Sequence, residues 1–593
     1  MTTVDEGGAL GLNDYQPPVA DLLEALDVAG FDEVLGLPAY ADVDRGSVEL
    51  AVAELARFVH DVIVPTDTPG DRQGSHLDPS TGDVSTPTSF RAAYDQYVAG
   101  GWGAIAFPAE HGGGGLPALL GVVQQEMLAS ANTALSLNPV LTQSAIELLL
   151  AWGSEDQQAR YLPKLVTGAW CGTMNLTEPE AGSDLGEVQT RAVQGEDGRW
   201  RVSGTKIFIT WGEHDLVDNI VHLVLARTEG APPGTKGLSL FVVPKVLVGP
   251  DGALGERNGV RCLRVEDKLG IHGSPTCVME YEDAVGELVG EEHGGIRAMF
   301  TMMNTARLSV GLQGPSVAER AYQHARRYAE ERHQGRAVGV VPPRRSVLTE
   351  HPDVRRMLLT MRTCTLASRL LIYTATAQRD IARHGSDPEA RAAAQARVDL
   401  LTPVAKAWSS DVGYLVASTG MQVLGGIGYV EESGMAQRLR DARIAPIYEG
   451  TNGIQAIDLV TRKIPQDDGR WVATLLEDVR VTIAPQAIDG LGESYARLAE
   501  AVTVVQSTTE QLLAWVRQSP EDALAGATAY LELFGLTLGG WLLVRRAERA
   551  ARYGLPTAAM AAGESEFFAT EHVARVPGLV GPALAGAGRL AWL

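Results

Sequence analysis

Apolar residues recur every three or four positions over much of the first 150 residues. The repeat is clear in Ser47–Val62 and Pro117–Ser130, and it is typical of helices that bury one face. Two stretches interrupt it, Thr66–Thr88, which is rich in Pro, Gly, Asp and Thr, and the glycine run Gly112–Gly115. We expect both to be loops. The pattern predicts an N-terminal helical domain over residues 1–165.

The pattern changes near Trp170, where short β-rich runs replace the helical repeat. Glycines and prolines separate these runs, as they do between strands. The predicted strands include Lys206–Thr210, Ile220–Ala226, Leu238–Val243 and Cys277–Tyr281. We therefore expect a compact antiparallel β domain over residues 166–292.

Long helical repeats return after Ile296. Met299–Arg332, Pro352–His384 and Glu389–Val423 each carry an apolar stripe, and short polar links join them, as in an antiparallel bundle. We predict this helical bundle over residues 293–466 and a helical extension, rich in Ala and Leu, over residues 467–593.

The expected fold class is thus α+β multidomain, with an N-terminal helical domain, a central antiparallel β domain, a C-terminal helical bundle and an additional C-terminal helical extension. Where two helical blocks flank a β domain, the junction is a favoured place for a cofactor.

Size, charge and cysteine content narrow the class of protein. The 593 residues exceed the roughly 250–300 at which a single core stops growing, so several domains are expected. The net charge of −23 argues against nucleic acids and anionic membranes as main partners. The four cysteines form no metal-ligand pair, which favours reduced thiols and a cytoplasmic location. We expect no secretory signal and no membrane span.

The run Ile447–Gln455 sets one carboxylate, Glu449, between apolar residues and a glycine. Poor solvation raises the proton affinity of such a group, and a carboxylate tuned in this way can remove a proton from carbon. Gly450 lets the backbone bend, and the Thr451 hydroxyl can cap a following helix, whose N–H groups could meet a phosphate. A buried glutamate at a helix start is the alternative.

Three further runs carry candidate binding chemistry. Met174–Asp184 offers hydroxyls and the N–H groups of a Pro-led turn, unless it is only a surface turn. In Gly204–Gly212, alternation would place Phe208 and Thr210 on one face of a strand, against a planar cofactor or in an ordinary core. Met421–Tyr429 is rich in glycine but follows a helix, so a helix C-cap is its alternative.

In this order, the runs resemble the acyl-CoA dehydrogenase family of flavoproteins over about residues 50–465. The resemblance is carried by Leu176–Asp184, Lys206–Gly212, Gln422–Gly426 and the segment from Arg440 to Thr451. The tail from residue 470 resembles the extra helical domain of the longer bacterial members, the fatty-acyl or methylthiopropionyl-CoA type.

The resemblance implies FAD as cofactor, an acyl-CoA as substrate, electron-transferring flavoprotein as acceptor, and a homodimer or a tetramer. It implies that FAD is bound by Met174, Leu176, Thr177, Gly182, Ser183, Phe208, Thr210, Arg332, Gln334, Gln422, Gly426, Thr451 and Gly453. Four of these, Arg332, Gln334, Gln422 and Gly426, would reach the FAD of the partner subunit. The implied substrate contacts are Ser183, Asn304, Arg307, Tyr448 and Gly450.

The implied reaction is α,β-dehydrogenation to a trans-2-enoyl-CoA, as in fatty acid β-oxidation. Glu449 would remove the α-proton while the β-hydride passes to flavin N5. Some relatives carry the base on an earlier bundle helix, but Met302–Leu308 holds no acid here, which favours Glu449 as the sole base. The rival hypotheses are an acyl-CoA oxidase that passes electrons to oxygen and a non-catalytic acyl-CoA-binding scaffold.

Overall fold

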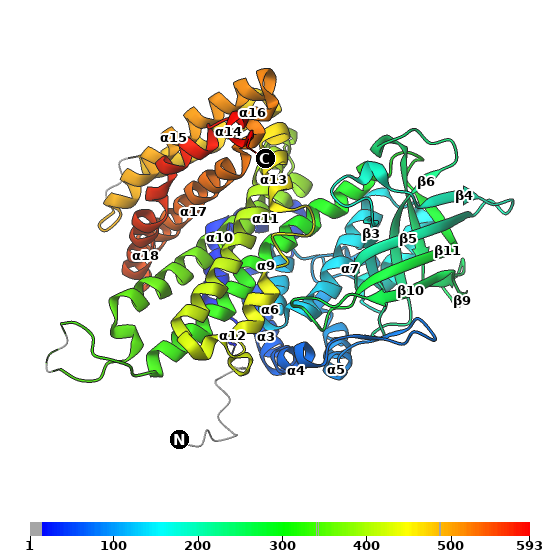
Figure 1. The fold of residues 1–593 in the computed structure, drawn as a ribbon, viewed down its shortest axis with the longest axis horizontal. Coiled ribbons are helices and arrows are strands. Elements are labelled where there is room, and N and C mark those ends of the chain that lie inside the picture. The colour runs from blue at the N-terminus through cyan, green and yellow to red at the C-terminus, as the bar shows by residue number, and fades with distance from the viewer. Residues whose placement is uncertain (1–14, 340, 342, 485–487, 593) are drawn as a thin grey trace. The chain divides into compact units, whose positions relative to one another are not determined.

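The computed structural model of the protein describes residues 15–339, 341, 343–484 and 488–592 (Figure 1). The chain divides into two compact units. The first combines the segment up to Ala53 with Pro117–Glu126 and the chain from Val310 onwards; the second combines Glu54–Leu116 with Met127–Ser309. The bounds of the four predicted domains stay predictions.

The predicted N-terminal helices are present. Helix α3 covers Arg45–Phe58 and α6 covers Ala118–Ala131, close to the predicted repeats. The expected loop over Thr66–Thr88 is wrong in part, because it contains helix α4 (Asp67–Gln73) and the short strands β1 (His76–Leu77) and β2 (Val84–Ser85). Pro69 and Gly70 did not exclude α4 because Pro69 lies in its first turn, where a backbone N–H has no helical partner.

The β domain is built on a ring of five strands. Strand β5 (Trp200–Thr210) pairs with β4 (Arg191–Gln194), β4 with β6 (Ile220–Thr228), β6 with β7 (Leu238–Pro244), β7 with β11 (Thr276–Val289), and β11 with β5 again. Strands β10 (Val260–Val265) and β3 (Cys171–Asn175) extend the sheet at β11 and β6. Closing the ring leaves few unpaired strand edges.

The expectation of a purely antiparallel sheet is wrong. Strand β6 runs parallel to both β3 and β4. Local alternation predicts where strands lie but does not choose their partners, and strands joined by a long connection can pair in parallel.

Alternate residues of the strands serve two separate cores. Val224 and Phe241 face a cluster formed by the strands, whereas Leu223 and Leu240 face a cluster that includes helices α7 (Thr133–Trp152) and α8 (Glu155–Val166). The two-residue period of a strand makes this possible. One side of β6 and β7 therefore carries helices in this unit.

The long helices of the other unit match the sequence closely. Helix α9 covers Gly295–Glu331, α10 covers Pro352–His384 and α11 covers Pro388–Leu424. Shorter helices follow at Met435–Ala442 (α12) and Asn452–Asp458 (α13). Gly425 ends α11 with a positive φ of 66°, so the glycine run does act as a helix end.

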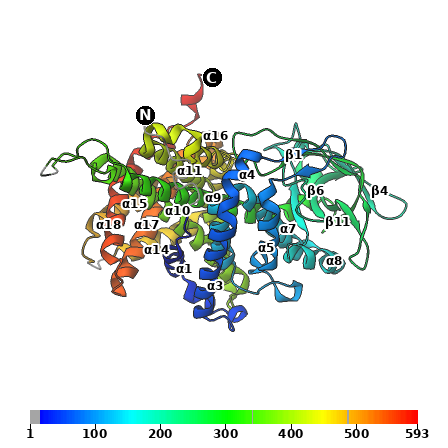
Figure 2. The same cartoon turned by 90° about the horizontal axis from the view of Figure 1, so that it is seen from below.

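The C-terminal extension is helical, and part of it packs on α10 and α11. Its main helices are α14 (Arg470–Ile483), α15 (Gly492–Gln518), α17 (Ala527–Arg552) and α18 (Ala558–Glu571). Figures 1 and 2 both show α17 beside α10 and α11. The approach is close, since a Cβ on Gly535 would lie 2.5 Å from the Trp408 ring.

Two helices among the described residues, α7 and α17, are long and apolar enough to cross a membrane. However, 89% and 83% of their most apolar windows are buried in the protein. Core helices meet the same criteria of length and composition, so this is weak evidence for a membrane span.

Candidate active site

The predicted site residues divide between the two units. The run from Met174 to Thr210 and the pair Asn304 and Arg307 belong to one, whereas the Glu449 segment belongs to the other. Each set has a geometry of its own.

The motif after β3 forms a tight turn with an exposed end. Met174 and Leu176 are buried in the core shared with α7 and α8. The N–H and C=O groups of Glu178 and Ala181 bond to each other at 3.0 Å, which closes the turn. Gly182 and Ser183 follow and are exposed. The predicted FAD contacts therefore include both core side chains and an exposed turn.

A buried ion pair, missed by the sequence analysis as a functional feature, fixes this motif to β5. Lys206 Nζ lies 2.8 Å from Glu178 Oε1 and donates to the Leu176 carbonyl at 2.9 Å. The Lys206 and Glu178 side chains are 0% and 5% exposed. Residue 206 lies in a predicted strand, but no local pattern marks a lysine that points into the core.

The charges of this pair are set by burial and by each other. Burial lowers the pKa of the Lys206 ammonium to about 8, although Glu178 acts in the opposite direction. Burial favours the neutral acid of Glu178, but the Lys206 charge and hydrogen bonds, with those from Thr190, hold its pKa below the ordinary value. Both groups are therefore charged near pH 7.

Phe208 occupies an unusual backbone position next to this pair. Its φ is 59° and its side chain is 59% exposed. The register between β11 and β5 shifts between the pairs Cys277–Ile209 and Met279–Lys206, which leaves an extra residue on β5. Such a bulge explains why Lys206 is buried whereas Phe208 is exposed, against simple alternation. Phe208 is exposed and Thr210 is half-buried, on either side of the buried Ile209 in the chain, and their common face stays a prediction.

Glu449 lies in a left-handed turn before helix α13. Its φ is 55° and that of Gly450 is 81°. Glu449 is half-buried and precedes the N-cap residue by two positions, so it is not a buried glutamate at the helix start. The predicted cap is confirmed, because the Thr451 hydroxyl accepts a hydrogen bond from the Ile454 N–H at 3.2 Å. An αL conformation is uncommon for a residue other than glycine and is typical of functional sites.

Tyr448 anchors the same turn on its other side. Its hydroxyl donates to Gln313 on α9. Burial raises the pKa of Tyr448, and the neighbouring negative charge of Glu449 raises it further, although the Gln313 contact acts in the opposite direction. Tyr448 therefore stays protonated and can keep donating.

The remaining predicted contacts are mostly at the surface. Asn304 is exposed, and Arg307 Nη1 lies 3.4 Å from its side-chain oxygen. The four residues expected to reach the partner's FAD, Arg332, Gln334, Gln422 and Gly426, are all exposed. Their exposure leaves them open to contacts outside the chain, but their roles stay predictions.

Family models match the chain in four consecutive segments. They are described as the N-terminal, middle and C-terminal domains of acyl-CoA dehydrogenase, over residues 50–169, 173–284 and 293–464. A fourth, described as acetyl-CoA dehydrogenase C-terminal like, covers residues 475–590.

Relatives match over most of their length. The chain is 46% identical to 3-methylmercaptopropionyl-CoA dehydrogenase of Ruegeria pomeroyi, over 89% of this chain and 90% of the relative. It is 36% identical to the broad-specificity linear acyl-CoA dehydrogenase of Mycobacterium tuberculosis, over 90% of both chains.

Solved structures share the fold over nearly the whole chain. Caenorhabditis elegans ACDH-11 in complex with C11-CoA matches with a TM-score of 0.79 at 19% identity, over 100% of this chain and 97% of the other. Acyl-CoA dehydrogenase complexed with FAD from Bacillus anthracis matches with a TM-score of 0.74 at 20% identity, over 93% and 90%.

Proposed function

The chain belongs to the acyl-CoA dehydrogenase family and has the additional C-terminal domain of its long members. We propose that it converts an acyl-CoA to a trans-2-enoyl-CoA, with FAD as cofactor and Glu449 as base. Its class, an oxidoreductase of the acyl-CoA dehydrogenase kind, follows from this membership. The observation that carries the proposal is the position of Glu449, whose carboxylate is presented by a left-handed turn at a capped helix.

The residues of the β domain fit FAD. Phe208 exposes an aromatic side chain at a bulge, and Thr210, two residues further along the strand, is half-buried. Gly182 and Ser183 add exposed backbone and hydroxyl groups that suit the polar edge of a flavin ring. An exposed aromatic side chain on a strained backbone does not stabilise the folded chain by itself. Stacking against a planar ligand would explain why an aromatic residue occupies this position.

The chemical step removes two hydrogens from adjacent carbons. The α-proton passes to the Glu449 carboxylate, the β-hydride leaves with its electron pair, and a C=C bond forms between the two carbons. Bound FAD supplies the acceptor of that hydride at N5. A thioester α-C–H is a much weaker acid than a carboxylic acid, so the Glu449 side chain alone does not suffice.

Two effects of the protein reduce the difference in acidity between the substrate α-C–H and the Glu449 carboxylic acid. The backbone N–H of Glu449 would donate to the thioester oxygen as negative charge develops there. Substrate that expels water would raise the pKa of the half-buried Glu449, since burial disfavours the charged carboxylate. Tyr448 is held by Gln313 and gives the turn a fixed position on α9.

The finer features are also proposals. We propose a role in fatty acid β-oxidation, electron-transferring flavoprotein as acceptor and a homodimer, which the family resemblance implies, and a cytoplasmic location, which the cysteine content favours. The names of the two relatives support testing a short thioether acyl-CoA and a series of linear acyl-CoAs as substrates.

The test is anaerobic titration of the purified protein with these acyl-CoAs. We expect a yellow, FAD-containing protein whose absorbance near 450 nm bleaches with substrate, as a reduced flavin does. Glu449→Gln should keep its FAD and lose bleaching, whereas Glu477→Gln, at an exposed position on α14, should bleach normally. Full bleaching of Glu449→Gln would contradict the assignment of the base.

The rival hypotheses give different outcomes in the same experiment. Rapid peroxide release in air, without reduction of electron-transferring flavoprotein, would identify an oxidase. A purified protein that binds acyl-CoA but carries no FAD would identify a scaffold.

A further inference from the structure

A fully buried glutamine contacts the backbone on both sides of the turn that carries Glu449. Gln455 on α13 is 0% exposed. Its Nε2 lies 3.5 Å from the Glu449 carbonyl oxygen and 3.3 Å from the Gly450 carbonyl oxygen. The two carbonyls belong to consecutive residues with positive φ, so one side-chain amide faces both ends of the left-handed turn.

The other end of the Gln455 amide is not satisfied. Among the described residues, its Oε1 is buried and has no hydrogen-bond partner. A buried acceptor without a partner destabilises a protein, and an apolar side chain of the same length would avoid that cost. The contacts of Nε2 are long and add little to stability. Folding alone therefore does not account for a glutamine at this position.

The start of α13 is fixed to α11 by a second amide. Asn452 Oδ1 accepts a hydrogen bond from Lys406 Nζ at 2.9 Å. Asn452 Nδ2 donates to the Ala407 carbonyl at 3.1 Å and to Asp411 Oδ1 at 2.9 Å. A lysine can only donate and a carbonyl can only accept, so these neighbours determine which way the amide points. The asparagine thus holds the helix against a rigid partner.

Together these contacts link a rigid helix to the peptide groups beside the base. We propose that Gln455, on a helix fixed by Asn452, is a positioning residue that orients the Glu449 carboxylate toward the α-carbon of the substrate. The inference rests on the proposed function of Glu449. Catalytic hydrogen bonds that are long without substrate can tighten when it binds, and a misplacement of about 1 Å can slow a reaction by about 100-fold.

The decisive variant is Gln455→Met, which has a similar length and no polar atoms. It removes both the contact to the turn and the unsatisfied oxygen, so its denaturation midpoint should be unchanged or higher. We expect the rate constant of flavin reduction at saturating acyl-CoA to fall about 10- to 100-fold, with FAD content unchanged. Thr461→Ala is the matched control, because it removes a hydroxyl that bonds only locally after α13.

The rate constant separates positioning from a folding defect. A partly unfolded sample bleaches less, but its folded fraction bleaches at the normal rate. In addition, α-deuterated substrate should show a larger isotope effect in Gln455→Met, since slower proton removal limits the reaction more fully. Asn452→Ala should slow reduction in the same way, which gives a second variant if the first fails to fold.

Each outcome decides the matter. A slower rate constant with a larger isotope effect and normal stability supports the inference. A normal rate constant in both variants overturns it. Glu449→Gln must be inactive in the same assay, and full activity there would refute the proposed base rather than the role of Gln455.

Discussion

Single residues in strained backbone positions occur in each of the two sets of predicted site residues. Phe208 and Glu449 have φ angles of 59° and 55°. Phe208 follows the buried Lys206, which pairs with Glu178, by two positions, and Glu449 precedes Gly450, whose carbonyl oxygen lies 3.3 Å from Gln455 Nε2. Such conformations cost about 1–3 kcal/mol each, so the surrounding structure must impose them. At both positions the strained residue carries the side chain to which we assign chemistry or cofactor contact.

Replacing the strained aromatic separates stability from cofactor binding. In Phe208→Gly, relief of strain offsets the greater freedom of the unfolded chain, so the free energy of unfolding should change by no more than about 1 kcal/mol. FAD affinity should fall at least about tenfold, because the aromatic contact is lost. Denaturant unfolding of the apoprotein and FAD titration measure the two effects.

A second left-handed residue on the neighbouring strand provides the control. Asp283 has a φ of 46° and also lies at a register shift between β11 and β5. Asp283→Gly makes the same backbone change away from the predicted FAD contacts and should keep FAD affinity. If both variants lose FAD equally, the general rigidity of the sheet is responsible, and not the Phe208 ring.

Elements of this protein are joined by polar contacts that cap helices from a distance. Helix α6 begins at Ala118, and Asp380 on α10 accepts hydrogen bonds from the N–H groups of Ala118 and Leu119 at 3.0 Å each. The same carboxylate accepts from the Tyr40 hydroxyl at 2.9 Å. Helical N–H groups at a helix start have no partner within the helix, so Asp380 acts as its cap.

Removing this cap should destabilise the folded protein. Asp380→Ala leaves two buried N–H groups and a buried hydroxyl without an acceptor, which should lower the free energy of unfolding by about 2–3 kcal/mol. Asp380→Asn keeps one acceptor oxygen and should cost about half as much. Chemical denaturation measures both. Equal losses in the two variants would show that charge matters here, and not the hydrogen bonds.

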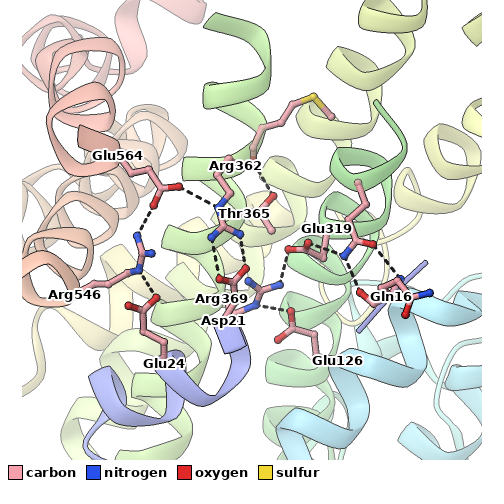
Figure 3. A network of polar contacts seen from close by, with 12 residues as sticks. Gln16, Asp21, Glu24, Glu126, Glu319, Arg362, Thr365, Arg369, Arg546 and Glu564 are labelled. Atoms are coloured by element: carbon pink, nitrogen blue, oxygen red, sulfur yellow. Dashed lines mark hydrogen bonds and ion pairs between the residues drawn. The ribbon is translucent and has the colours of Figure 1, made fainter. Parts of the chain in front are cut away.

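At the scale of the whole molecule, the segment before residue 50 and the segment after residue 464 form ion pairs with each other. Both lie outside the N-terminal, middle and C-terminal family domains, which cover residues 50–169, 173–284 and 293–464. Figure 3 shows Arg362 on α10 between Asp21 of helix α1 (Val19–Ala29) and Glu564 of α18. It also shows Arg546 of α17 between Glu24 and Glu564. The N-terminal helix and the C-terminal extension are therefore parts of one network.

The pH dependence of this network has a defined sign. Burial opposes ionisation of Asp21, but the hydrogen bond and charge of Arg362 hold its pKa below the ordinary 3.8. As the pH falls, a group whose pKa is lower in the folded state takes up its proton at a lower pH in the folded state than in the unfolded state. Its contribution to the free energy of unfolding is therefore present above the ordinary pKa and is lost as the pH falls through the pKa of the folded state.

Asp21→Asn should lower the free energy of unfolding by about 1–2 kcal/mol near neutral pH. The difference from the unmodified protein should stay constant above about pH 5 and shrink below about pH 4. Denaturant unfolding over this range tests it. Asp32→Asn, which alters an 82% exposed partner of Arg45, should show little effect. If the difference in the free energy of unfolding grew as the pH fell, the pKa of Asp21 would be raised in the folded state and not lowered.

The sequence by itself determined the long helices, the four longest strands and the family. Residues such as those of α10 follow the helical period over the whole element, and Glu449, Gly450 and Thr451 are adjacent in the chain, so local order preserves their relation. The Thr451 cap was predictable for the same reason, since its partner is three residues away.

Only the tertiary structure decided the parallel partners of β6, the bulge at Phe208, the buried Lys206–Glu178 pair and the role of Gln455. These features depend on which distant segments meet, and on which polar groups burial leaves unpaired. Hydrophobic periodicity predicts that one face of an element is buried, but it does not predict which other element packs against that face. The proposed base could thus be named from the chain, whereas the residues proposed to support it could be identified only in the packed fold.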